Sequence, residues 1–200
     1  MFKRKISVLG SAAAMSLIPS LALAHTGHGA TSGFFHGFEH PLGGLDHVLA
    51  MVLVGMLAVQ LGGRAVYAVP ASFVALMAAG GALGMAGVEI PFVETGIALS
   101  IVVLGLAVAF RAKASVLAAM ALVSLFAVFH GHAHGAEMPA DASGVSYGMG
   151  FALATVILHA TGAGFGFCLA RIGARRGDAV LRAAGGAAAV CGLAILAGLV

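Results

Sequence analysis

Six long apolar runs divide the chain after residue 40, each near the roughly 20 residues that a helix needs to cross a bilayer. Short linkers between the runs hold nearly all of the charged residues. Because backbone polar groups in lipid must be satisfied within the segment itself, we expect each run to be a helix. The sequence therefore predicts an all-α, polytopic membrane helix bundle over residues 40–200, with six transmembrane helices at 45–62, 66–87, 92–110, 114–134, 145–169 and 182–200.

Composition excludes a soluble or a disordered protein. Hydrophobic residues make up 61% of the chain and charged residues only 8%, whereas a soluble domain carries about 25% charged residues and disordered chains are polar. The 30 glycines fit closely packed membrane helices. The net charge of +3 comes from Lys and Arg between apolar runs, so no nucleic-acid partner is expected. Cys168 and Cys191 both lie in apolar runs, which indicates buried small hydrophobes.

The first residues have the pattern of a bacterial secretory signal peptide. Residues 1–24 combine a basic start, an apolar stretch and a small-x-small cleavage site at Ala22-Leu23-Ala24. An uncleaved first membrane helix is the alternative. Cleavage after Ala24 would leave a flexible, His-containing periplasmic segment at 25–39, ahead of the six-helix transmembrane domain at 40–200.

Charge in the linkers predicts the orientation of the bundle. Basic residues of the mature chain occupy alternate linkers, at 64, 111–113 and 171–182, which the positive-inside rule places in the cytoplasm. The turn at 88–91 and the loop at 135–144 carry Glu or Asp and are then periplasmic, with both mature termini. The signal peptide independently places the mature N-terminus outside. We therefore expect a multi-pass protein of the bacterial inner membrane.

A first polar cluster stands at the periplasmic start of the first span, in the sequence HPLGGLDH at 40–47. Pro41 suits the first turn of a helix. Asp46 and His47 are adjacent, so they converge with His40 only if the preceding turn or a neighbouring helix closes the site. A helix cap with interfacial histidines is the alternative interpretation. Ionisable groups at membrane depth are costly and usually functional, which favours a binding site.

A second cluster, FHGHAHGAE, ends the fourth span. His130 and His134 are spaced i,i+4 and share one helix face, and Glu137 continues that face if the helix persists. His132 points elsewhere, and we expect it to face water. Imidazole with carboxylate and without thiolate suits a divalent transition ion such as Ni²⁺, Co²⁺ or Zn²⁺. An exposed His-rich helix end is the alternative.

The predicted topology places both clusters at the same membrane face, so they can meet in the outer half of the bundle. Glu94 starts the third span at the same level and could join them, although compensation of the helix dipole explains it equally well. His159 lies deeper, about 22 Å from the outer end of its span. It is either a deep relay ligand or a hydrogen-bonded structural histidine. His36 is a further candidate, because Phe-His-Gly-x-x-His occurs at 35–40 and again at 129–134, as in an inverted repeat.

The two clusters fit H-P-x-x-G-x-D-H and F-H-G-x-A-H-G-x-E, and with six spans after a signal peptide they resemble the HupE/UreJ family of hydrogenase and urease accessory proteins. The resemblance covers essentially the whole mature chain. It implies a permease for nickel, or for cobalt in some members, that supplies metal for hydrogenase or urease maturation. It also implies a set of metal-binding residues: His40, Asp46, His47, Glu94, His130, His134 and Glu137.

These observations predict a secondary transporter that imports Ni²⁺, with Co²⁺ as the alternative cargo, rather than an enzyme, and with no resident cofactor. No G-x-x-x-x-G-K-[ST] sequence occurs, so the chain does not hydrolyse ATP through a P-loop. A membrane-embedded zinc enzyme, a di-His haem protein and a non-transporting metal-binding accessory protein remain alternatives. The sequence leaves open the coupling of transport and whether the chain forms a homo-oligomer.

Overall fold

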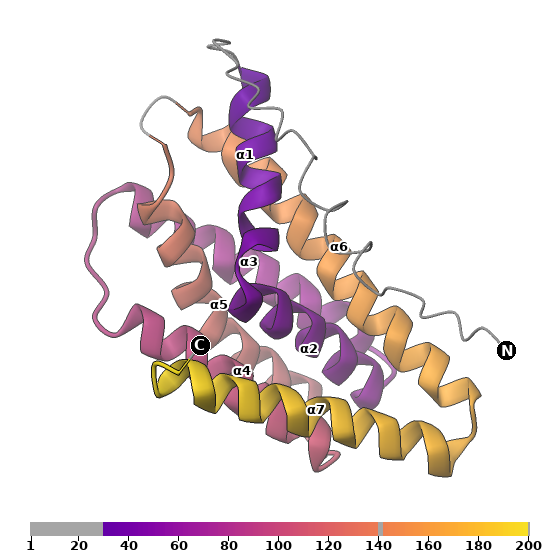
Figure 1. Cartoon of the computed structure of the whole chain (residues 1–200). Helices are drawn as coiled ribbons and strands as arrows, with labels where there is room; N and C mark the ends of the chain where they lie inside the picture. Colours follow the sequence, from indigo (N-terminus) through magenta and orange to yellow (C-terminus); the bar gives the residue numbers. More distant parts are fainter. Residues whose placement is uncertain (1–29, 140–141, 200) are drawn as a thin grey trace, which may run out of the picture.

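A computed structural model describes residues 30–139 and 142–199 of the chain. This part consists of helices and turns, with no strand among the residues described, so the all-α class is confirmed (Figure 1). The predicted signal peptide, His25 and His28 lie outside the described residues. The helices are α1 (Ala30–Gly43), α2 (Leu45–Leu61), α3 (Ala65–Met85), α4 (Val93–Ala109), α5 (Val116–Ala136), α6 (Gly144–Arg171) and α7 (Ala174–Leu196).

Four helices, α3, α5, α6 and α7, are long and apolar enough to cross a membrane individually. Helix α4 is apolar but only 17 residues long. Helices α1 and α2 pass the same test as a pair that is bent by 84°, as in a broken span or a re-entrant loop. These helices are compatible with a multi-pass membrane protein, while the count of six spans stays a prediction.

Helices α2 to α6 begin and end within two residues of the predicted runs, but α7 does not. It begins at Ala174, eight residues before the predicted start of the last span, and so includes Arg175 and Arg182. Alanine and arginine are strong helix formers, so charge in this stretch does not interrupt the helix. Arg111, just after α4, donates a 2.5 Å hydrogen bond to Asp178 in the first turns of α7.

The segment expected to be flexible is helical from Ala30 onward. Its Gly37 packs so closely on α6 that an added Cβ would overlap the backbone of Tyr147. Docking on α6 therefore holds a glycine-rich stretch that has little helix propensity of its own. As a consequence, Pro41 lies in the last turn of α1, not in the first turn of the next helix as predicted.

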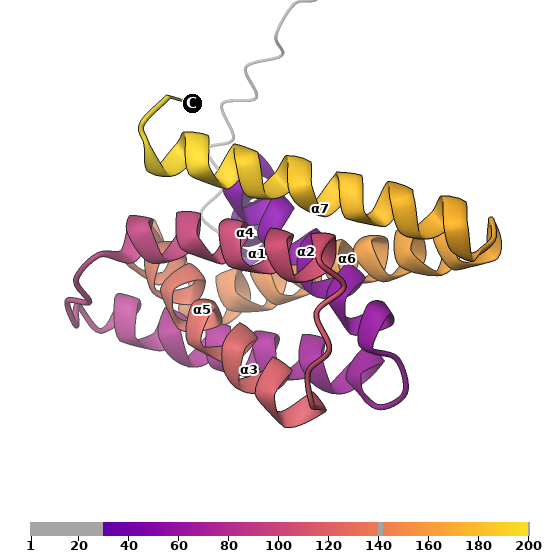
Figure 2. The same ribbon diagram turned by 90° about the horizontal axis from the view of Figure 1, so that it is seen from below.

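The helices pack in close pairs, with α3 against α5, α4 against α7, and α6 along both α1 and α2. Seen from below, α4 with α7 and α3 with α5 lie on opposite sides of α2 and α6 (Figure 2). Glycines make the close approaches possible: a Cβ on Gly131 of α5 would overlap the Met77 carbonyl of α3, and one on Gly162 of α6 would overlap the Val52 carbonyl of α2. This packing fixes the face that α5 presents to α2.

Candidate metal site

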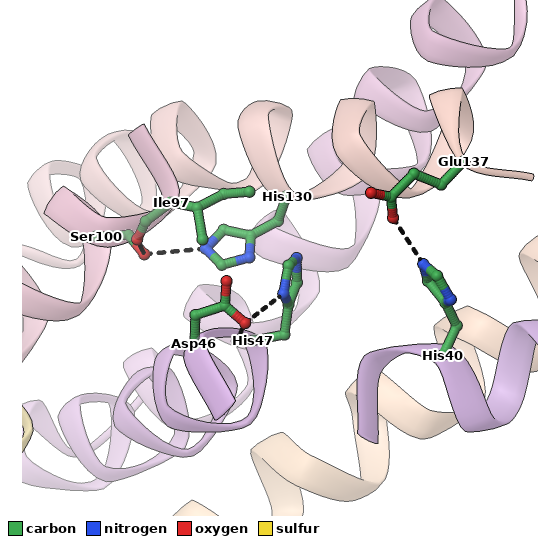
Figure 3. Close-up of polar contacts among 7 residues, drawn as sticks. All are labelled: His40, Asp46, His47, Ile97, Ser100, His130 and Glu137. Atoms are coloured by element: carbon green, nitrogen blue, oxygen red, sulfur yellow. Dashed lines mark hydrogen bonds and ion pairs between the residues drawn. The ribbon is translucent and has the colours of Figure 1, made fainter. Parts of the chain in front are cut away.

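The bend between α1 and α2 brings the two predicted motifs together. His40 lies at the end of α1 and His47 in the first turn of α2, and both face the last turns of α5 (Figure 3). On α5 the i,i+4 spacing places His130 and His134 on the side that meets them. Residues from distant parts of the chain thus surround one region, as the shared membrane face predicted.

The imidazole rings of this region contact one another edge to face or at a tilt. The ring centroid of His47 lies 4.1 Å from that of His134 and 4.7 Å from that of His130, and the His40 ring lies 4.6 Å from the His134 ring. His47, His130 and His134 are 7%, 0% and 4% exposed. Buried polar groups are costly unless they are paired, so a cluster of buried imidazoles needs partners or a ligand.

Asp46 determines which nitrogen of His47 is free. Its Oδ1 accepts hydrogen bonds from the backbone N–H of His47 at 2.8 Å and from the His47 Nδ1 at 2.9 Å. An ionised carboxylate only accepts, so the ring proton lies on Nδ1 and Nε2 carries a lone pair. That Nε2 is buried without a hydrogen-bond partner. A carboxylate behind a histidine is the usual support of a metal-ligating imidazole.

Gly44 has no side chain, and the space this leaves is occupied by the hydrogen-bonded side chains of Asp46 and His47. A Cβ at this position would lie 2.6 Å from the Asp46 Oδ1 and 3.1 Å from the His47 Nδ1. The glycine also stands at the break between α1 and α2, with an extended backbone. A side chain here would therefore push the carboxylate off the imidazole.

Ser100 on α4 determines which nitrogen of His130 is free, as Asp46 does for His47. Its hydroxyl donates a 2.6 Å hydrogen bond to the carbonyl of Ile97 and lies 2.9 Å from the Nε2 of His130. A hydroxyl has one proton, so with that proton on Ile97 it accepts from Nε2–H. The Nδ1 of His130 then carries a lone pair, and it is buried without a partner (Figure 3). Sequence reasoning missed Ser100; its one signal is a hydroxyl within the otherwise apolar GIALSIVVLG.

The outer end of the site contains a carboxylate. His40 Nε2 lies 2.9 Å from the Glu137 Oε2, and the two side chains are 35% and 60% exposed. Ligand atoms of His40, His134 and Glu137 lie within 4.8 Å of one another. Donors on one ion sit about 2 Å from it and thus up to about 4 Å apart. Small side-chain rotations would bring this trio onto a single ion.

Aromatic and thioether side chains line the other side of the site. A cavity of about 570 Å³ between α3, α5 and α6 is bordered by His134, Tyr147, Phe151, Met77 and Met85. The Phe151 ring lies 4.2 Å from the His134 ring. The Tyr147 hydroxyl is buried and has no hydrogen-bond partner. The sequence did not single out these neighbours, because aromatic and Met residues in a span usually face lipid or pack in the core.

The other predicted candidates do not share the hydrogen bonds of this cluster. Glu94 and His36 are exposed, and neither makes a hydrogen bond or ion pair with a residue that the structure describes. His132 does not face water as expected: it is buried, and its Nε2 donates a 2.6 Å hydrogen bond to the Val88 carbonyl. His159 is buried deeper in the bundle, with both ring nitrogens unpartnered.

Comparison with known proteins agrees with the resemblance of the motifs. The family model described as HupE / UreJ protein matches residues 13–195. Protein HupE of Rhizobium leguminosarum bv. viciae is 47% identical over 194 residues, which cover 97% of this chain and 100% of that protein. No solved structure matches the chain. The family model and the full-length relative show that this membrane-helix protein, with its paired histidine motifs, belongs to the HupE/UreJ family.

Proposed function

We propose that this protein is an inner-membrane permease that imports Ni²⁺, with Co²⁺ as the alternative cargo, for hydrogenase or urease maturation. One observation carries the proposal most directly. His47, His130 and His134 come from two helices, and the His47 ring centroid lies within 4.7 Å of each of the other two. All three keep buried ring nitrogens that have no hydrogen-bond partner among the described residues. Such nitrogens are suited to a cation that sheds its water.

The donor chemistry selects the ion class. Imidazoles with one or two carboxylates bind Ni²⁺, Co²⁺ and Zn²⁺ well, whereas Mg²⁺ and Ca²⁺ prefer all-oxygen shells. The site contains no thiolate, since Cys168 and Cys191 lie elsewhere in the bundle. A mixed nitrogen and oxygen site binds a late transition ion less tightly than an all-thiolate site does. Weaker binding suits a transported ion, which must dissociate again.

The gradient of exposure suggests how the ion enters. Glu137 and His40 are accessible, so a hydrated ion can meet them first. Their carboxylate offsets part of the double charge before water is lost. Deeper in the site the Nε2 of His47 and the Nδ1 of His130 can replace further waters, with Asp46 contributing negative charge behind His47.

The proposal is tested by uptake of radioactive nickel, cobalt and zinc into proteoliposomes, with and without an ion gradient. We expect the wild-type protein to take up nickel with saturable kinetics. Asp46→Asn or His47→Ala should abolish uptake at a low external nickel concentration. Glu89→Gln, an exposed carboxylate in the outer turn 88–91, is the matched control and should transport normally.

Wild-type uptake in both site variants would defeat the proposed site. Metal that copurifies with the protein, together with no flux in liposomes, would instead favour a metal-dependent enzyme or a non-transporting accessory protein. Nickel binding and nickel flux are measured on the same preparations, so loss of binding can be distinguished from loss of transport alone.

A further inference from the structure

Below the metal site, His159 on α6 is a buried histidine with no partner. Its side chain is 3% exposed, and neither ring nitrogen has a hydrogen-bond partner among the described residues. A structural histidine would normally spend at least one nitrogen on a hydrogen bond, because burying an unpaired polar group is costly. The ring instead keeps a lone pair available within the bundle.

His159 borders a groove of about 550 Å³ between α3 and α6, together with Val66 and Pro70. Proline has no backbone N–H, so Pro70 cannot donate to the Val66 carbonyl four residues earlier. The Val66 carbonyl therefore lacks its usual helical donor, and His159 is the one polar residue among those that line the groove.

The ring of Phe73 stands between this groove and the outer site. It contacts His159 edge to face with ring centroids 5.1 Å apart, and its centroid lies 5.7 Å from that of His130. Phe73 is fully buried. An apolar ring between two imidazoles offers no donor to an ion, so it separates the two polar regions.

The depths of His130, Phe73 and His159 along their helices are consistent with a path for an ion through the bundle. Counted from the outer helix ends, His130 lies six residues into α5, Phe73 twelve into α3 and His159 fifteen into α6. At 1.5 Å per residue these positions are about 9, 18 and 22 Å deep. Outer histidine, aromatic ring and inner histidine thus follow one another toward the cytoplasmic side of the predicted topology.

The geometry points to His159 as a second, inner binding station for the transported divalent cation, closed off from the outer site by Phe73. This inference rests on the proposed function. Displacement of the Phe73 ring would let the ion pass from His130 to His159, whose unpartnered ring nitrogens can replace water on the ion. The ring then acts as the barrier that keeps the outer site from being a continuous pore.

Transport and binding measurements on the full chain test the inner station. We expect His159→Leu to bind nickel at the outer site with a Kd within threefold of wild type, while nickel uptake into proteoliposomes falls at least tenfold. His47→Ala should lose both binding and uptake. Wild-type uptake by His159→Leu, with outer-site binding intact, would overturn the station. Absence of nickel binding by the wild-type protein would overturn the proposed function itself.

The barrier is tested without nickel. In a Cys168→Ser, Cys191→Ala background, the thiol of a His159→Cys variant should be protected from a membrane-impermeant thiol reagent added outside spheroplasts. Adding Phe73→Ala should raise the labelling rate at least tenfold. Phe126→Ala is the matched control, because this buried phenylalanine on α5 makes no ring contact with a described histidine. Equal labelling rates with Phe73 and with Phe73→Ala would overturn the barrier.

Discussion

Ser100→Ala should weaken nickel binding although Ser100 is not itself a ligand. The hydroxyl sits 2.9 Å from the Nε2 of His130 and uses its own proton on the Ile97 carbonyl at 2.6 Å. It therefore holds the His130 proton on Nε2. Without it, Nε2–H is a buried donor with no partner, and the imidazole is free to carry its proton on Nδ1, the nitrogen that the proposed site needs.

The size of the effect follows from the burial of His130, which is 0% exposed. Leaving a buried donor unsatisfied costs about 1–3 kcal/mol. Part of this penalty falls on the metal-competent tautomer, and loss of an outer-shell partner of a metal-ligating histidine typically weakens metal affinity by about 10–100-fold. We expect the nickel Kd of Ser100→Ala to rise within that range.

Ser72→Ala on α3 is the matched control. Its hydroxyl makes the same kind of bond, donating to the Val69 carbonyl at 2.9 Å, but contacts no imidazole. Isothermal titration of nickel into the two purified variants and the wild type measures the difference, and thermal unfolding checks that all three are folded. A Kd for Ser100→Ala within twofold of wild type would refute the role assigned to the hydroxyl.

Further outcomes follow from the same contacts. Gly131→Ala should separate α5 from α3, because its Cβ would overlap the Met77 carbonyl; we expect a lower Tm and weaker nickel binding, whereas Gly148→Ala, with open space at its Cβ, should change neither. Glu137→Gln should weaken nickel binding less than His47→Ala, since the Glu137 side chain is 60% exposed and water can replace it; equal losses in titrations would contradict this.

The apolar runs were sufficient to locate most helices because a bilayer imposes length and composition on each span. The same logic fails where charge and helix coexist. Arg175 and Arg182 suggested a linker, yet they lie on α7, since basic residues at the end of a span can remain helical while their charged ends reach water. Helix α1 was missed for the opposite reason: its glycines disfavour an isolated helix, and contact with α6 supplies the stability.

The topology predicted from linker charges places the two motifs at the same depth in the membrane, which is why they were expected to meet. It does not fix the direction in which a side chain points around its helix. Depth and the family resemblance both made Glu94 a candidate; it is exposed at the start of α4, while Ser100, less than two turns further along, contacts His130. His132 lies between two site histidines in the sequence and is turned to the Val88 carbonyl instead. Rotation of each helix depends on packing that a single sequence does not display.

The break at Gly44 explains what the bent helix pair contributes to the proposed metal site. In a continuous helix, His40 and His47 are separated by nearly two turns, about 10 Å along the axis. The 84° bend lets the end of α1 and the start of α2 approach the same turns of α5 from two directions. His134 then contacts His40 on one side and His47 on the other. In the proposed import, an ion accepted at the exposed Glu137 would therefore pass His134 to reach the buried pair of His47 and His130. Straightening this bend would leave the outer and the buried donors without a shared neighbour, and the stepwise loss of water on which the proposed import depends would have no intermediate position.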